Sequence, residues 1–277
     1  WYNPALYANV SDLSAGLDFM TYAAGSTWMG AHFVKAFGER HTMAVGAQYM
    51  NYGKMDETDE AGNTLGQFSA KDIVIGAGYS YLLSDRWTGG ANLKMMVSNL
   101  ADYTALAAAI DVGVNYYDDE NDLSVSASLQ NIGTQLKAYH DGQRTHLPFT
   151  LALGFSKGMA HLPVRFHVTM TDVTRWKSSY YVLPENKDKD KSDKVGFGKK
   201  ALNHFVLGLD ILPTDYLYLS VGYNFRRAYE LKASGSSHLA GLSAGAGVNV
   251  KHFKFGVSYA KYHQASNSIM ANVGYAF

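Results

Sequence analysis

The sequence has no cysteine, only five prolines and no long hydrophobic run. Without cysteine, neither a disulfide framework nor a thiolate metal site is possible. The longest apolar run, residues 105–110, stops at Asp111 and is far shorter than the roughly 20 residues that a membrane helix needs. Since the 24 basic and 24 acidic residues balance, the charge gives no general attraction to nucleic acid. If the chain enters a membrane, it must do so as β-strands.

The residues that favour strands and flexible turns are abundant, with 20 tyrosines, 13 phenylalanines and 27 glycines. Large apolar residues alternate with small or polar ones along most of the chain; in residues 123–130, leucine, valine and alanine alternate with serine and glutamine. This period of two predicts strands with one apolar face and one wet face. Fourteen strands, with almost no helix, are predicted near residues 14–23, 27–36, 42–53, 67–82, 86–98, 103–117, 122–132, 148–157, 163–173, 203–212, 216–226, 238–250, 252–262 and 267–277.

The lengths of the connections favour a membrane barrel over a soluble β-sandwich, although both alternate along their strands. Every second connection is a short turn, whereas all connections longer than ten residues belong to the other set: 54–66, 133–147, 174–202 and 227–237. A transmembrane barrel has short periplasmic turns and longer extracellular loops. The sequence therefore predicts an all-β fold, a 14-stranded antiparallel transmembrane β-barrel formed by residues 14–277. Residues 1–13 are expected to form a luminal or periplasmic segment, with both termini in the periplasm.

Aromatic residues gather at the strand ends next to the short turns, among them Tyr79, Trp87, Tyr116, Tyr275 and Phe277. Membrane barrels carry such aromatic girdles where their outer face meets the two interfaces. Tyr275 and Phe277 also end the last predicted strand, in phase with its apolar face. They are similar to the aromatic terminal signal that outer-membrane barrels present to their insertion machinery, and we expect that role for them.

Six segments spread over nearly the whole chain carry a resemblance to a known family: WYNPAL (1–6), NYGKMDETDEAGNTLGQFSAKD (51–72), AIDVGVNYY (109–117), NIGTQLKAY (131–139), LPF (147–149) and HFVLGLDILPTDYLYLSVGYNFRR (204–227). In this order they resemble the PorQ proteins of the type IX secretion system in Bacteroidota. That family is related to PorV and, more distantly, to the FadL-type fatty-acid channels. Its members have mature sequence before the WYNPAL position, so the resemblance implies a further N-terminal segment.

The resemblance implies a FadL-like barrel, integral to the outer membrane of a Gram-negative bacterium of the Bacteroidota, with no enzymatic activity. Its partners would be the lipid bilayer, lipopolysaccharide and a soluble surface protein similar to PorZ. PorQ is thought to hold that protein in the cell-surface attachment complex, and PorV- or PorU-like components are the further candidates. A FadL-like channel for hydrophobic small molecules is the alternative function, because fourteen strands enclose a wide lumen unless a segment such as residues 1–13 obstructs it.

No catalytic or cofactor motif is present in the sequence: it has no GxSxG, HExxH or P-loop pattern. The ten histidines show no metal-ligand spacing either. Four polar residues of neighbouring predicted strands are expected to meet inside the barrel, as compensating luminal groups rather than as a proton relay: Arg165, His167, His204 and Asp210.

The long loops are the predicted binding surface, because loops on a rigid scaffold are where binding sites concentrate. The loop 174–202 is rich in lysine, which suits an acidic partner or the phosphates of lipopolysaccharide, and the loop 54–66 is acidic. A solvated loop tip without a partner is the alternative interpretation of such charge runs. The residues expected to contact a partner are Lys187, Lys189, Lys191, Lys194, Asp56, Glu57, Tyr139, Arg226 and Arg227.

Overall fold

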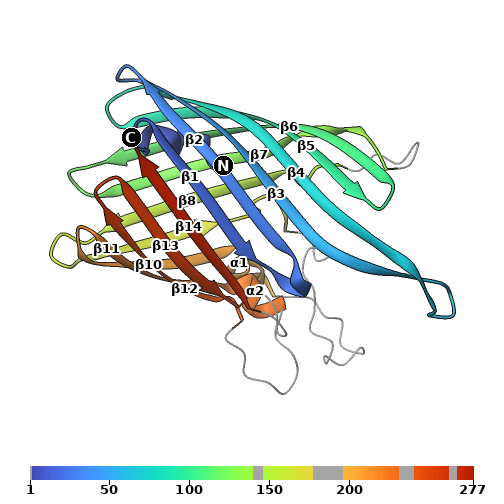
Figure 1. The fold of residues 1–277 in the computed structure, drawn as a ribbon. Coiled ribbons are helices and arrows are strands. Elements are labelled where there is room, and N and C mark those ends of the chain that lie inside the picture. Colours follow the sequence, from blue (N-terminus) through green and yellow to red (C-terminus); the bar gives the residue numbers. More distant parts are fainter. Residues whose placement is uncertain (1, 140–145, 177–195, 231–239, 262–266) are drawn as a thin grey trace.

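The computed structural model describes residues 2–139, 146–176, 196–230, 240–261 and 267–277, which form a closed antiparallel barrel of fourteen strands (Figure 1). Each strand pairs with its neighbours in sequence, and β1 pairs with β14 to close the cylinder. This confirms the predicted strand number and architecture. The strands are β1 (Ser14–Thr21), β2 (Thr27–Phe37), β3 (His41–Thr58), β4 (Thr64–Leu82), β5 (Trp87–Leu100), β6 (Tyr103–Asp118), β7 (Leu123–Lys137), β8 (Thr150–Gly158), β9 (Val164–Met170), β10 (Phe205–Thr214), β11 (Leu217–Asn224), β12 (Leu242–Val250), β13 (Phe253–Ala260) and β14 (Ser268–Ala276).

Short helices occur where the sequence predicted strand or loop. The described helices are the 3-10 turns η1 (Pro4–Asn9) and η2 (Ala23–Gly25) and the α-helices α1 (Phe197–Leu202) and α2 (Phe225–Glu230). The prediction of a strand through residue 226 is wrong, because the Asn224 side chain accepts a 3.0 Å hydrogen bond from the backbone N–H of Arg227. An asparagine in that position caps a helix start. No helix among the described residues is long and apolar enough to span a membrane.

The predicted acidic loop 54–66 is mostly strand. β3 and β4 pair out to Thr58 and Thr64, so their connection is only residues 59–63. β2 pairs with β3 only as far as Asn51, and β5 pairs with β4 only as far as Ala70. Residues 54–58 and 64–68 therefore form a two-stranded ribbon that extends beyond the neighbouring strands (Figure 1). Asp56 and Glu57 lie in this ribbon rather than in a loop.

The outer face of the barrel is apolar. On β1, β2 and β5, residues such as Leu17, Met29 and Leu93 are exposed, whereas their sequence neighbours Gly16, Gly30 and Asn92 point inward and are buried. A continuous band of large exposed apolar side chains around a cylinder has no protein core to cover it. Hydrocarbon is the solvent that suits this band, as in transmembrane barrels.

One end of the barrel carries the short turns, and both the start of β1 and the end of β14 lie there (Figure 1). The backbone N–H of Phe277 donates to the carbonyl of Leu13 at 2.9 Å. The Tyr275 ring lies 4.8 Å from the rings of both Phe253 and Phe277. The two residues expected to act as an insertion signal thus belong to an aromatic cluster at the strand pair that closes the barrel; their role in insertion stays a prediction.

Candidate functional site in the barrel lumen

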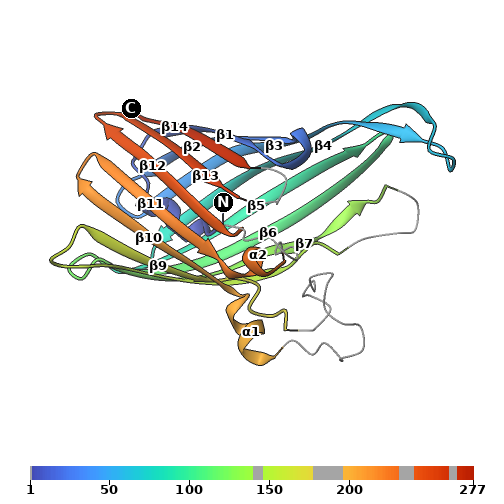
Figure 2. The same cartoon turned by 90° about the horizontal axis from the view of Figure 1, so that it is seen from below.

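The segment before β1 lies inside the barrel. Figure 2 shows it between the two walls, and η1 packs against the inner faces of β3, β4, β5 and β6. The Asn3 side chain caps η1 by accepting a 3.0 Å hydrogen bond from the backbone N–H of Ala5. Its amide donates to the carbonyl of Val114 on β6 at 3.3 Å. Pro4 and Ala5 are buried, so η1 obstructs this part of the lumen.

Glycines on the barrel wall make room for η1. A Cβ on Gly90 would lie 2.5 Å from the carbonyl carbon of Pro4, and a Cβ on Gly113 would lie 2.0 Å from the side-chain oxygen of Asn3. A Cβ on Gly78 would lie 2.3 Å from the Tyr7 ring. At Gly78 and Gly113 the added Cβ would force a side chain to shift. At Gly90 it would meet backbone atoms, so this position in particular requires glycine.

A buried ion pair lies beside η1, on β5 and β6. The Lys94 ammonium is 2.8 Å from one oxygen of the Asp111 carboxylate, and the Asp111 side chain is 0% exposed. Asp111 also accepts from the backbone N–H of Asn131 at 2.8 Å, and Asn131 accepts from Lys94 at 2.9 Å. Asn131 has a φ of 60° and lies at a β-bulge where two residues of β7 face one of β6. The bulge thus turns a backbone N–H toward the carboxylate, which needs such donors when it is buried.

Between η1 and the long-loop end lies a cavity of ≈ 530 Å³. Its wall combines apolar side chains from several strands with Lys94 and Asn131, and Arg227 of α2 also lines it. Since Arg227 shares this cavity with inward residues of the barrel, α2 covers part of its mouth at the long-loop end. The cavity is lined by Tyr2, Met20, Tyr22, Trp28, Gln48, Val74, Lys94, Met96, Ala107, Ala108, Ala109, Gln130, Asn131, Leu147, Arg227 and Met270.

The four polar residues expected to meet inside the barrel separate into three places. His167 Nε2 and an oxygen of Asp210 are 2.7 Å apart, and both face the lumen. Arg165 lies opposite Asp210 in the strand register, yet its guanidinium pairs with Asp122 of a short turn at 2.9 Å. His204 is fully buried at the other end of β10, where its Nδ1 is 2.8 Å from the carbonyl oxygen of Thr171. The predicted cluster of four is therefore wrong, and one His–Asp pair remains.

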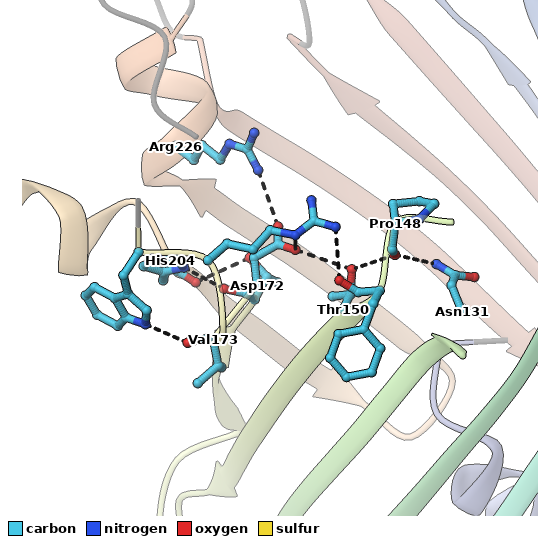
Figure 3. A network of polar contacts seen from close by, with 11 residues as sticks. Asn131, Pro148, Thr150, Asp172, Val173, His204 and Arg226 are labelled. Carbon is cyan, nitrogen blue, oxygen red and sulfur yellow. Dashed lines mark hydrogen bonds and ion pairs between the residues drawn. The ribbon is translucent and has the colours of Figure 1, made fainter. Parts of the chain in front are cut away.

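A polar network fastens α2 to the rim of the barrel (Figure 3). One oxygen of Asp172 accepts from Arg226 of α2 at 3.3 Å, and the other accepts from the Thr150 hydroxyl of β8 at 3.3 Å. Arg175 lies 3.8 Å from the same carboxylate and donates to the carbonyl of Phe149 at 3.0 Å. Asp172 thus connects three segments at the long-loop end.

The remaining residues expected to contact a partner lie in different surroundings. Asp56 accepts from Gln67 across the ribbon at 2.9 Å. The Tyr139 hydroxyl donates to Ser98 at 2.5 Å, so this side chain folds back onto β5. Lys187, Lys189, Lys191 and Lys194 lie outside the described residues. Glu57 is exposed on β3, and Arg226 and Arg227 point toward the barrel as described above.

Sequence reasoning missed the group formed by Lys94, Asp111 and Asn131. Two signals pointed to it: Lys94 stands on the small, inward face of its strand, and Asp111 interrupts an alanine-rich apolar run. Within the described ranges, no three His, Asp or Glu side chains come together as a metal site.

Comparison with solved structures identifies the architecture. The toluene transporter TodX of Pseudomonas putida matches with a TM-score of 0.56 over 98% of this chain and 90% of its own, at 13% identity. CymD, a monoaromatic hydrocarbon channel, matches with a TM-score of 0.56 over 99% and 91%, at 14% identity. A FadL homologue of Pseudomonas aeruginosa matches with a TM-score of 0.56 over 99% and 93%, at 9% identity.

This chain has the FadL-type barrel fold. No protein-family model and no curated sequence matches the chain. The likeness is thus one of fold, and the resemblance to PorQ in particular stays a prediction.

Proposed function

We propose that the protein is an integral outer-membrane barrel of a Gram-negative bacterium through which hydrophobic small molecules pass. The observation that carries this proposal is the luminal cavity of ≈ 530 Å³ beside η1. Met20, Trp28, Val74, Met96 and Met270 give it an apolar wall. Ligand pockets of this kind have a volume of roughly 300–1,000 Å³ and combine apolar walls with a few polar groups.

The polar groups of the cavity suggest how a molecule would be oriented. Lys94 has three donor hydrogens, of which Asp111 and Asn131 accept two. Its side chain is 17% exposed and lies on the cavity wall, so a third donor is available to an oxygen of a bound molecule. This suits an apolar molecule with one hydrogen-bond acceptor. The hydrocarbon channels TodX and CymD share the fold, which is a second support.

The proposal is tested by the entry of the apolar dye N-phenylnaphthylamine into intact Gram-negative cells. Cells that make the protein should take up the dye faster than cells that do not. Val74→Trp fills the cavity and should abolish the difference, whereas Ile75→Trp adds the same side chain on the lipid face of the same strand and should not. Equal rates with and without the protein, or for Val74→Trp and the unchanged protein, would refute the proposal.

A second candidate function is the anchoring of a soluble surface protein, as the resemblance to PorQ and the type IX secretion system of Bacteroidota implies. It is favoured by the ribbon of residues 54–58 and 64–68, which projects beyond the barrel and carries Asp56 and Glu57. Replacing residues 55–67 with an Asn-Gly turn should then release the partner from the tagged barrel in a detergent pull-down, while dye entry continues. Retention of the partner by the shortened barrel would contradict this function.

A further inference from the structure

The two sides of the lumen differ in their contact with water. On the side of η1, the inward residues Asn92, Asp111 and Asn115 are at most 2% exposed. On the opposite side, formed by β9 to β13, the inward side chains of His167 and Asp210 are 34% and 27% exposed. A packed half, filled by η1, thus lies beside a half whose polar side chains reach water.

Many residues that line the wet half are small. Glycine and serine recur at the inward positions of its strands and leave space that larger side chains would fill, and the Tyr218 ring covers Gly247. A second cavity, of ≈ 340 Å³, lies on this wall and is separate from the apolar one. Its inward lining includes His167, Thr169, Gly208, Asp210, Ser220, Gly222, Ser243, Gly245 and Ser258.

The titratable side chains that line or flank this cavity lie in pairs. His167 pairs with Asp210 at 2.7 Å, and Arg165 pairs with Asp122 at 2.9 Å. A pore lined by single-sign charge rings selects ions of the other sign. Titratable groups that lie in pairs among serine hydroxyls provide hydrogen bonds to polar solutes and form no ring of charges of one sign.

We propose that the part of the lumen lined by β9 to β13 is a hydrophilic path for small polar solutes and inorganic ions. It is separate from the apolar cavity, and α2 lies next to β10 at the long-loop end of this wall. Arg226 holds α2 to Asp172 at 3.3 Å, and Asp172 is anchored to β8 through Thr150. The contact between Arg226 and Asp172 is therefore one restraint on the position of α2.

The path is tested by single-channel recording of the purified full-length barrel in planar bilayers in potassium chloride. The unchanged protein should give discrete conductance steps with weak preference for either ion. Ser220→Phe combined with Ser243→Phe places two rings on the wet wall and should lower the step size by at least about two-fold, because conductance follows pore diameter. Leu219→Phe adds a ring beside Ser220 on the lipid face, where Leu219 is 40% exposed and does not line the cavity, and should leave it unchanged.

Asp172→Asn weakens the restraint on α2 and should increase the time spent in the open state. Absence of steps from the unchanged protein, or equal step sizes for the double variant and Leu219→Phe, would overturn the proposal. The dye experiment reports the apolar cavity alone, since Val74→Trp fills that cavity and not the wet wall. Failure of one proposal is thus distinguishable from failure of the other.

Discussion

Replacing Gly90 by alanine should loosen η1 from the barrel wall. The added Cβ would lie 2.5 Å from the carbonyl carbon and 2.6 Å from the carbonyl oxygen of Pro4, and 2.6 Å from the backbone nitrogen of Ala5. All three are backbone atoms, which cannot rotate away as a flexible side chain does. Overpacking of this kind costs about 1–3 kcal/mol.

A single cysteine reports this change, because the chain has none of its own. With Ala5→Cys as a common background, the thiol lies at a position that is 0% exposed and reacts with a soluble maleimide only when η1 leaves the wall. If the full overpacking energy destabilises the state in which η1 packs against the wall, the labelling rate should rise by about 5- to 150-fold. The rate is measured in detergent by mass spectrometry at several times.

Gly89→Ala is the matched control. It lies next to Gly90 on the same strand, and its Cβ would meet only the Leu83 side chain, at 3.4 Å and 3.9 Å. Any effect of alanine on the unfolded chain is common to both variants and cancels in the comparison. If the two variants label at the same rate, the close seating of η1 against β5 is incorrect.

Three further predictions concern the wall, the outer face and the ribbon. Asp111→Asn leaves Lys94 without its buried partner and should lower the free energy of unfolding of the barrel by about 3–5 kcal/mol in chemical unfolding. Adding Lys94→Met should restore part of this stability. No recovery in the double variant would argue against the ion pair. Leu93→Arg, in the middle of the apolar band, should lower the free energy of unfolding in lipid vesicles by about 2–4 kcal/mol, whereas Trp87→Arg at the strand end should lower it by at most about 1 kcal/mol. Equal losses would mean that lipid does not cover this face. Hydrogen bonds from the Asn63 side chain and backbone lower the pKa of Asp59 in the ribbon turn, so their contribution is complete above the unfolded value of roughly 3.9 and is lost as the pH falls through the lowered pKa. Hydrogen exchange at Ala61 and Asn63, corrected for intrinsic rates, should therefore show less protection at low pH, and constant protection would contradict the assignment.

The strands were predictable because inward and outward positions alternate along a strand, so small or polar residues alternate with large apolar ones in the sequence. The end of β11 was not: Phe225 continues the alternation of Leu217 to Tyr223 and extends the apparent strand, while the cap formed by Asn224 ends it. The ribbon was missed for the opposite reason. Residues 54–58 and 64–68 have no lipid-facing band, so their pairing leaves no apolar period in the sequence.

The luminal contacts depend on register and could not be predicted. Asp111 meets Lys94 only because β5 and β6 pair Asn92 with Asp111, one step along the inward face. Asn131 joins them through a bulge that shifts β7 by one residue. Arg165 illustrates the same limit: strand pairing places it opposite Asp210, but its long side chain reaches the turn that carries Asp122.

The ribbon also has a consequence for how copies of this protein share a bilayer. Within the described ranges, no strand pairs with one row of backbone groups of residues 54–58 in β3, and such a row is a template for sideways association. Two copies related by a two-fold axis along the membrane normal would bring the same row together at the same height. The carboxylates of Asp56 and Glu57 in one copy would then lie opposite those of the other copy, and like charges directly opposite one another are destabilising. The carboxylates thus oppose strand pairing between the projecting ribbons of neighbouring barrels, even at a high density of barrels in the bilayer.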